Sequence, residues 1–270
     1  MIGAVVYKLK ALNDDSLPEF HGQQLHGLCF NILEDFSAQL STMIHDKMSI
    51  KPFTSSLMEF GHDTVLRQNR QYIKAGAIMH WRLTALTDAV LQAFLSVKKG
   101  QLLTMGNLQL QVEDVITSPD IRNDAGIIEP EDMIAECFSL PPVRQITMDF
   151  RSVTSFRSGT NDFPWPLPEM IFGSLADKWK AMNMPGVIDA KTIRSKATTI
   201  IPSNWHGASR RVFLSQKRGV TGFIGSFTYQ VDNLDADLRQ ALLVLAAYAE
   251  FAGIGRWTAH GLGQVRMSIG

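Results

Sequence analysis

Cysteine is scarce in this sequence, which has Cys29 and Cys137 as its two cysteines among 270 residues. Both lie in apolar stretches, and they do not form a C-x-x-C motif. Disulfide frameworks and cysteine-based zinc sites need several cysteines at short, regular spacing. We therefore expect two buried thiols in a reducing compartment.

Net charge is also absent, because 26 Lys and Arg residues balance 26 Asp and Glu residues. A neutral chain has no general attraction for nucleic acid or membranes, so any such attraction must be local. The longest apolar run, residues 241–249, is too short to span a bilayer. The N-terminal M-I-G-A-V-V-Y-K-L-K lacks the layout of a signal peptide. We expect a cytoplasmic, soluble protein.

Metal-binding patterns are missing as well. The sequence has no H-E-x-x-H motif, no clustered carboxylates and no Cys/His pair with the spacing of metal ligands. Those patterns are the ones that bring several ligands onto one ion. We expect neither a metal nor another cofactor.

Glycine, by contrast, is concentrated near residue 260, in the stretch A-G-I-G-R-W-T-A-H-G-L-G-Q-V-R of residues 252–266. Its four glycines lie within eleven residues and are Gly253, Gly255, Gly261 and Gly263. A dinucleotide-binding motif requires a strand, then glycines, then a helix. Here a helical pattern precedes the glycines and a strand pattern follows them, which excludes that motif. A helix C-cap explains Gly253, and the remaining glycines favour a loop that lies against a phosphate chain.

Basic residues are concentrated too, in a window from 190 to 231 that contains no Asp or Glu. Its seven basic residues are Lys191, Arg194, Lys196, Arg210, Arg211, Lys217 and Arg218. Such a window is the expected footprint of a protein that binds a phosphate backbone. A solvated protein surface gives the same pattern, so the window alone leaves both interpretations open.

Hydrophobic periodicity predicts the same order of elements twice. In the first half we expect a strand at 2–12, a helix at 22–45, strands at 53–60 and 72–86, a helix at 89–97, and a hairpin of 102–105 with 108–116. In the second half we expect a strand at 145–156, a helix at 168–182, a hairpin of 211–216 with 222–231 around Lys217, a helix at 236–251, and a strand at 264–269. The order β-α-β-β-α-β predicts an α+β chain of two tandem ferredoxin-like (RRM-like) domains with antiparallel sheets. We place the domains at 1–140 and 141–270.

Four stretches of the chain resemble one known family. The segment A-E-F-A-G-I-G-R-W-T-A-H-G-L-G-Q-V-R, residues 249–266, is similar to the C-terminal glycine-rich signature of the RAMP superfamily. Residues 219–229, 143–179 and 40–57 resemble, in the right order, other stretches of its CRISPR-associated endoribonucleases. These enzymes cut precursor CRISPR RNA within its repeats. The resemblance implies two ferredoxin-like domains, the first of which carries the catalytic residues and the second the glycine-rich loop.

The resemblance also implies a reaction. The family cleaves repeat RNA without a metal, by attack of a ribose 2′-hydroxyl on the neighbouring phosphate, which leaves a 2′,3′-cyclic phosphate and a 5′-hydroxyl. His45 matches the general acid/base histidine of the family, and Lys51 matches the lysine that stabilises charge on the phosphate. Some members have a tyrosine where this chain has Phe30, so we expect a His45/Lys51 pair rather than three catalytic residues.

The remaining histidines are weaker candidates for catalysis. His21 and His26 lie at the start of the first predicted helix, where either is placed to share the role of His45. His206 lies in the basic window and His260 in the glycine-rich segment. Simple helix-dipole stabilisation by His45 and ordinary exposure of Lys51 are the alternatives to catalysis.

RNA binding is assigned to the second half of the chain. The residues assigned to it are Lys191, Arg194, Lys196, Arg210, Arg211, Lys217, Arg218, Gly253, Gly255, Arg256, Trp257, His260, Gly261 and Gly263. The expected partner is CRISPR repeat RNA, together with other subunits of a CRISPR effector complex if the chain belongs to one. Two alternatives remain: a RAMP subunit that binds RNA without cutting it, and a protein-interaction module.

Overall fold

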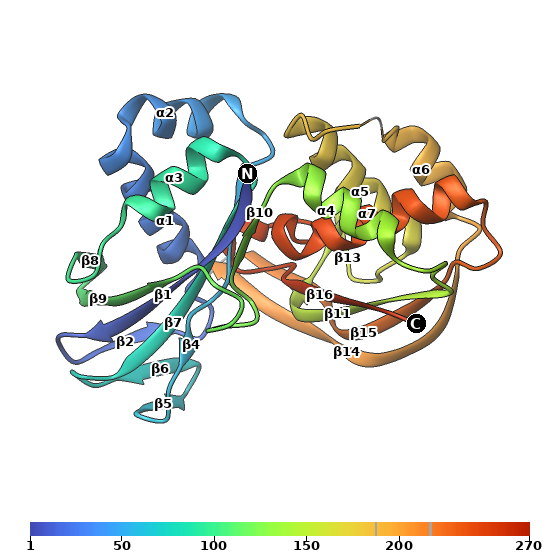
Figure 1. Cartoon of the computed structure of the whole chain (residues 1–270). Helices are drawn as coiled ribbons and strands as arrows, with labels where there is room; N and C mark the ends of the chain where they lie inside the picture. The colour runs from blue at the N-terminus through green and yellow to red at the C-terminus, as the bar shows by residue number, and fades with distance from the viewer. Residues whose placement is uncertain (187, 216–217) are drawn as a thin grey trace. The chain divides into compact units, whose positions relative to one another are not determined.

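The computed structural model describes residues 1–186, 188–215 and 218–270. The chain forms two compact units. The first consists of Met1–Ile127 with Ala259–Gly261, and the second of Ile128–Thr258 with Leu262–Gly270. In each unit helices cover one face of an antiparallel sheet (Figure 1). The hairpin turn predicted at Lys217 lies outside the described residues.

The main sheet of the first unit has its first strand near the centre. Its order is β3 (Phe53–Ser55), β7 (Ile78–Ala85), β1 (Ile2–Ala11), β9 (Leu108–Ile116) and β8 (Leu102–Met105). The strands pair antiparallel throughout. Two short strands join the sheet, β4 (Glu59–Phe60) on β7 and β10 (Gly126–Ile128) on β1. This order is the one expected of a ferredoxin-like fold, and the hairpin of β8 and β9 has the predicted bounds.

The helices of the first unit are α1 (Gly22–Phe36), α2 (Ala38–Lys47) and α3 (Asp88–Ser96). The prediction of one helix over 22–45 was therefore wrong, because the chain breaks at Ser37. Ser37 has extended backbone angles, and its hydroxyl accepts a hydrogen bond from the N–H of Leu40 at 3.3 Å. Serine is favoured at this N-cap position because its oxygen satisfies an otherwise free helix N–H. The apolar stripe continues across the break, which is why periodicity alone did not reveal it.

A second correction concerns the predicted strands at 53–60 and 72–86, each of which is divided in two. Residues 53–60 form β3 and β4, and both pair with β7. Tyr72 belongs to β6 (Arg70–Ile73), which lies in a separate three-stranded sheet between β2 (Asp15–Pro18) and β5 (Thr64–Arg67). The turn before β7 contains Gly76 at φ +90°, a conformation that glycine adopts without strain.

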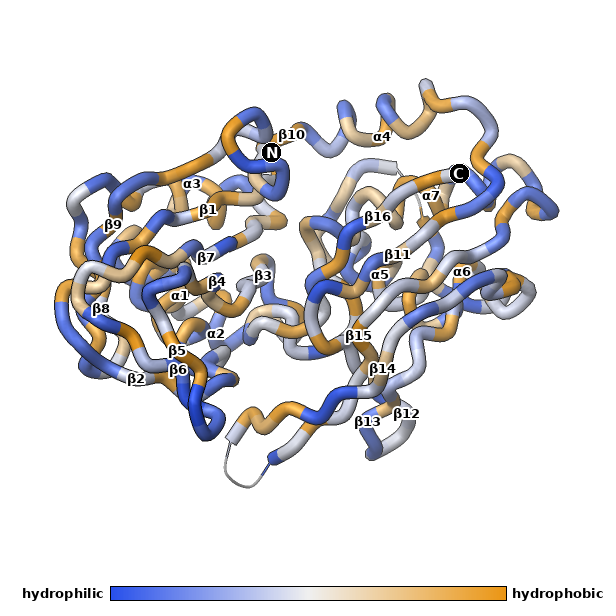
Figure 2. Tube along the Cα trace, turned by 90° about the horizontal axis from the view of Figure 1, so that it is seen from below, coloured by the Kyte–Doolittle hydropathy of each residue, from blue (hydrophilic) through white to orange (hydrophobic). Residues whose placement is uncertain are grey.

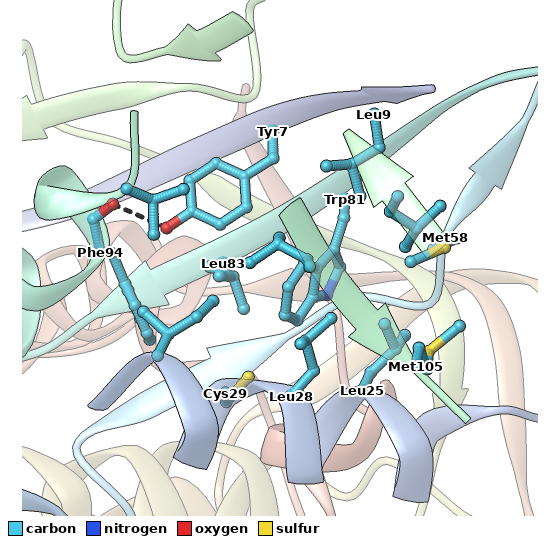
Figure 3. Close-up of a cluster of buried hydrophobic side chains, with 14 of the residues drawn as sticks. Tyr7, Leu9, Leu25, Leu28, Cys29, Met58, Trp81, Leu83, Phe94 and Met105 are labelled. Atoms are coloured by element: carbon cyan, nitrogen blue, oxygen red, sulfur yellow. Dashed lines mark hydrogen bonds between the residues drawn. The ribbon is translucent and has the colours of Figure 1, made fainter. Parts of the chain in front are cut away.

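The core of the first unit lies between its main sheet and α1, and Figure 3 shows part of it. Tyr7 and Trp81 are fully buried there and meet edge to face at 5.8 Å. The hydroxyl of Tyr7 donates to the carbonyl of Phe94 at 2.6 Å, and Nε1 of Trp81 donates to Oγ of Ser55 at 2.9 Å. Burial of each of these aromatic side chains stabilises the fold by about 2–3 kcal/mol. The two hydrogen bonds satisfy the Tyr7 hydroxyl and Nε1 of Trp81.

The second unit repeats the arrangement. Its sheet has the order β14 (Ile201–Ser215), β15 (Arg218–Gln230), β11 (Gln145–Thr154) and β16 (Val265–Ile269), again with the first strand between the third and the fourth. Its helices are α4 (Pro130–Ser139), α5 (Pro168–Ala181), α6 (Ala190–Ala197) and α7 (Ala236–Ala252). A small hairpin of β12 (Phe156–Ser158) and β13 (Asn161–Phe163) completes it. The predicted pair of ferredoxin-like folds is confirmed.

Strand β14 begins at Ile201, so the predicted start at residue 211 was wrong. It is an edge strand of the sheet, and nearly all of its residues are exposed. An exposed edge strand needs no hydrophobic alternation. Pro202 and Gly207 also have low β-strand propensity, so the sequence gives little sign of this strand. Helices α4 and α6 were not predicted either, because both are short.

Within the described residues, no helix is long and apolar enough to cross a membrane.

Candidate functional site

The end of α2 carries His45, and Lys51 holds that end in place. The ammonium group of Lys51 donates to the carbonyls of Ile44 at 2.8 Å, His45 at 3.0 Å and Met48 at 2.9 Å. A cation at the last carbonyls of a helix stabilises its C-terminus. An ammonium has three N–H donors, so all of them are engaged here. The pKa of Lys51 is lowered by partial burial, while nearby Asp46 acts to raise it.

The ring of His45 is accessible, with 70% of the side chain exposed. Its Nδ1 lies 2.8 Å from Oδ1 of Asp46, and the hydrogen bond leaves Nε2 as the other ring nitrogen for proton transfer. In the part of the chain that the structure describes, Nε2 has no hydrogen-bond partner. The ring also meets Phe30 edge to face at 5.4 Å. His45 is thus accessible and oriented by contacts on two sides.

Phe30 is half-buried and lies at the centre of an aromatic and basic cluster. Its ring contacts His26 at 5.0 Å, His45 at 5.4 Å and Phe53 at 5.8 Å between centroids. The ammonium of Lys51 lies 5.9 Å from the same ring. We call these residues, with His260, the Phe30 cluster.

The tip of the glycine-rich loop, Ala259–Gly261, belongs to the first unit and completes this cluster. The rings of His26 and His260 stack at 3.9 Å with an interplanar angle of 19°. Nδ1 of His26 donates to the carbonyl of Ala259 at 3.1 Å, and Ala259 is buried in the core. Gly22 permits this approach, since a Cβ there would lie 1.9 Å from the carbonyl oxygen of His260. Two histidines 234 positions apart in the numbering are therefore neighbours.

From the sequence, His26 and His260 were among the weaker candidates for catalysis. His26 precedes Phe30 by four residues on α1, so the two share a helix face, and that spacing was an available signal. Nothing local in the sequence places His260 beside His26. Only the packing of the loop tip onto α1 shows it.

Burial sets the charge of these two histidines. It lowers the pKa of His26, as do the charges of Lys51 and His45, while the Ala259 carbonyl acts in the opposite direction. It lowers the pKa of His260 to about 3, with smaller contributions from His26 and Lys51. Both rings are accordingly neutral at pH 7. His21, also predicted as a candidate, is instead a buried structural residue whose Nε2 accepts from the N–H of Met58 at 3.0 Å.

Outside the tip, the glycine-rich loop packs closely within the second unit. The N–H of Ile254 donates to the carbonyl of Gly263 at 2.8 Å. A Cβ on Gly263 would lie 2.1 Å from the carbonyl oxygen of Ile254, and one on Gly255 would lie 2.4 Å from that of Ser155. Both glycines have positive φ. Their identity is thus required by backbone packing, and the assignment of the four glycines to RNA binding stays a prediction.

Trp257 contacts two arginines in the second unit. The guanidinium of Arg218 is 4.6 Å from its ring and that of Arg256 is 5.5 Å away. Arg256 also pairs with Asp162 at 2.7 Å. Trp257 has φ +62°, an uncommon conformation for a bulky residue and one that deserves a functional explanation.

The basic window is partly neutralised within its own unit. Arg194 on α6 pairs with Asp177, and Lys196 pairs with Asp235 at 3.0 Å. Lys191 on α6 and Arg210 and Arg211 on β14 are exposed. His206 is exposed on the same strand, and Figure 2 shows hydrophilic residues followed by hydrophobic ones along β14. Lys217 lies outside the described residues.

Across the described residues, no group of three or more His, Cys, Asp or Glu side chains is placed to hold a metal ion. The chemistry that the described groups can perform is proton transfer at imidazole nitrogens beside a cationic side chain.

Comparison with known proteins gives matches over both units. The family model described as "CRISPR Cas6 N-terminal domain" matches residues 5–126, and the model described as "CRISPR-associated endoribonuclease Cas6" matches residues 148–265. A curated CRISPR-associated endoribonuclease Cas6 of Mycobacterium tuberculosis (strain CDC 1551 / Oshkosh) is 24% identical over 191 residues. That match covers 70% of this chain and 59% of the length of the relative.

Solved structures match over nearly the whole chain. A product complex of the Thermus thermophilus Cas6 protein TTHB231 is 25% identical, with a TM-score of 0.79, and the match covers 99% of this chain and 100% of that one. A product complex of the Cas6 protein TTHA0078 is 20% identical, with a TM-score of 0.76 and 99% of each chain covered. A Cas6-related protein from Pyrococcus furiosus is 11% identical, with a TM-score of 0.63 and 99% of each chain covered.

Proposed function

Because the chain belongs to the family of the CRISPR-associated endoribonuclease Cas6, we propose that it binds CRISPR repeat RNA in precursor transcripts and cuts it to produce mature crRNA in the cytoplasm. The observation that carries the proposal is the accessible His45, oriented beside Phe30 on a helix end that Lys51 holds. Two further findings support RNA as the ligand, since similar structures include a product complex and a substrate mimic complex of Cas6 proteins.

The proposed reaction is metal-independent transesterification. The 2′-oxygen upstream of the cut attacks phosphorus, the bond from phosphorus to the 5′-oxygen breaks, and the products carry a 2′,3′-cyclic phosphate and a 5′-hydroxyl. His45 supplies acid/base catalysis through Nε2, which is the ring nitrogen not bonded to Asp46. Lys51 keeps positive charge beside the reacting phosphate and fixes the position of His45 through its carbonyl. One solved relative is a histidine-to-alanine variant of TTHA0078.

RNA binding is proposed for the second unit. The exposed Lys191, Arg210 and Arg211 contact phosphates, and Trp257 with its two arginines presents a stacking surface to a base. The remaining cations of the window and the glycine-rich loop support this surface.

The test is cleavage of a CRISPR-repeat RNA in excess EDTA by the parent protein, by His45→Ala and by the control His62→Ala, which replaces an exposed histidine of the first unit. We expect the parent and the control to cleave equally, and His45→Ala to lose about 10²–10⁴-fold in single-turnover rate. A repeat with a 2′-deoxy sugar upstream of the cut should bind and stay intact.

Two results would contradict the proposal. Cleavage that stops in EDTA would exclude the metal-independent mechanism, and an undiminished rate in His45→Ala would exclude His45. Repeat binding without any cleavage by the parent would instead identify a non-catalytic RNA-binding subunit. That second candidate has one observation in its favour, since Phe30 has no hydroxyl where some family members have tyrosine.

A further inference from the structure

Two histidines contact the ring of Phe30 from two different helices. His26 on α1 meets it edge to face at 5.0 Å, and His45 on α2 does so at 5.4 Å. Transesterification needs one group that accepts the proton of the 2′-hydroxyl and another that donates a proton to the leaving 5′-oxygen. A single imidazole cannot be neutral and protonated in the same step. The two imidazoles that contact the ring of Phe30 therefore match the two proton transfers of the reaction.

The two rings have different anchors. Nδ1 of His45 is 2.8 Å from a carboxylate oxygen of Asp46, which accepts its hydrogen. Nδ1 of His26 donates to the uncharged carbonyl of Ala259 at 3.1 Å. Since Nδ1 of His26 must carry a hydrogen to make this bond, the lone pair of its neutral form is on Nε2. Each anchor leaves Nε2 for the substrate.

The surroundings of His26 favour its neutral form. Its ring is half-buried, and it stacks with His260 at 3.9 Å and with Phe53 at 5.9 Å. The titratable groups that act on it from the neighbouring segments are Lys51 and His45, and each disfavours a positive charge on His26. His260, the third basic group against it, is itself held neutral by burial. The ring is thus fixed, uncharged and still partly accessible.

We infer that His26 is the general base of the cleavage reaction and that His45 is its general acid. This assignment rests on the proposed function and names the second catalytic group at the same site. Nε2 of His26 takes the proton of the 2′-hydroxyl as the bond from the 2′-oxygen to phosphorus forms. Protonated His45 gives its Nε2 proton to the 5′-oxygen as the bond from that oxygen to phosphorus breaks. Exchange with water then returns both rings to their starting states.

The sharpest variant is His26→Asn. An asparagine amide keeps an N–H near the position of Nδ1, so it can still donate to the Ala259 carbonyl, but it has no basic nitrogen in place of Nε2. We expect His26→Asn to lose about 10²–10⁴-fold in single-turnover cleavage, while its affinity for the 2′-deoxy repeat stays within about twofold of the parent because no RNA-binding group is removed. The matched control, His62→Asn, should cleave at the parental rate.

A substrate whose leaving group needs no proton distinguishes the general acid from the general base. A repeat RNA with sulfur in place of the 5′-oxygen at the cut has a leaving group that needs no proton. It should therefore restore cleavage by His45→Ala and leave His26→Asn slow. The pH–rate profile gives a second readout, since the rise in rate from acid to neutral pH should disappear in His26→Asn, where no base is left to deprotonate.

The outcomes separate the inference from the proposal on which it rests. If the parent does not cut repeat RNA, both fail. If the parent cuts and His26→Asn cuts equally well, the proposed function stands and His26 is only a structural anchor. Rescue of His26→Asn but not of His45→Ala by the sulfur substrate would overturn the assignment by reversing the two roles.

Discussion

The Phe30 cluster of the first unit and the basic window of the second differ in how the fold produces them. In the cluster, contacts between distant segments orient each imidazole, as the hydrogen bond from His26 to Ala259 shows. In the window, the charges follow directly from composition, and the fold pairs some of them, such as Arg194 and Lys196, with carboxylates of the same unit. The geometry of the imidazoles depends on long-range packing, whereas the cationic surface depends on which charges remain accessible.

The largest effect is expected from a substitution that pushes the loop tip away from α1 and so disrupts the long-range contacts of the Phe30 cluster. In Gly22→Ala the new Cβ would lie 1.9 Å from the carbonyl oxygen of His260, so the anchor of His26 must move. Overpacking of this kind costs about 1–3 kcal/mol of unfolding free energy, and a displacement near 1 Å at a catalytic group costs about 10²-fold in rate. Urea unfolding and single-turnover cleavage measure the two effects.

Gly27→Ala is the matched control on the same helix. A Cβ at Gly27 meets nothing within 4 Å, and the residue is exposed. Alanine is the better helix former by about 1 kcal/mol, so this variant should be slightly more stable and cleave at the parental rate. A Gly22→Ala protein that cleaves as fast as Gly27→Ala would show that the loop tip does not position His26.

The second prediction concerns the base of the same loop. Lys178 on α5 is buried, and its Nζ donates to the carbonyls of Ala252 and Gly253, both at 2.8 Å. Burial lowers its pKa to about 7. Above that pH the neutral amine still has two N–H groups for these two carbonyls. Loop geometry at this point is therefore kept when the charge is lost.

The sign of the pH effect follows. Between pH 7 and the ordinary lysine value near 10.4, the unfolded chain holds a proton that the folded chain has released, so stability rises with pH across this window. The limiting slope is about 1.4 kcal/mol per pH unit, and urea midpoints at pH 7 and pH 9 measure it. Lys178→Met should remove this contribution, while Lys180→Met, at an exposed position on the same helix, should keep it. Equal pH dependence in the two variants would contradict the burial argument.

The smallest effect is expected at the cations. Arg218 packs on Trp257, whereas the guanidinium of Arg194 is already bonded to Asp177 and to the carbonyl of Gly173. Arg218→Gln should weaken repeat-RNA binding about 3- to 10-fold, because the stacking surface at Trp257 loses the nearer of its two cations. Arg194→Gln should change the affinity less than about twofold. Binding titrations over a range of salt concentrations measure the affinity of both variants. A larger loss of affinity in Arg194→Gln than in Arg218→Gln would contradict the prediction.

The order of elements was predictable because each half carries its hydrophobic stripes in the same sequence, and the sheet orders confirm it. Boundaries were harder where a local interaction competes with periodicity. The Ser37 N-cap divides a continuous apolar stripe, and the exposed β14 has no stripe to detect. Such features depend on hydrogen bonds and on edge position, which composition does not encode.

The candidate site shows the same limit. His45 and Lys51 were identified by resemblance, and the structure adds how each is held, although neither catalytic role has been tested. The position of His26 beside Phe30 could have been predicted, because the two residues are four positions apart on one helix. Its pairing with Ala259 and His260 was not, because 233 positions separate the hydrogen-bonded residues and no local pattern links them.

The assignment of Ala259–Gly261 to the first unit has a consequence for synthesis. Domains generally fold from the N-terminus while the chain is still being made, so the first sheet can form early. The imidazole of His26 nevertheless lacks its carbonyl anchor until Ala259, 233 positions further along the chain, has been synthesised. The hydrogen bond that holds His26 therefore forms only after nearly all of the 270 residues have been translated, long after the strands and helices of the first unit.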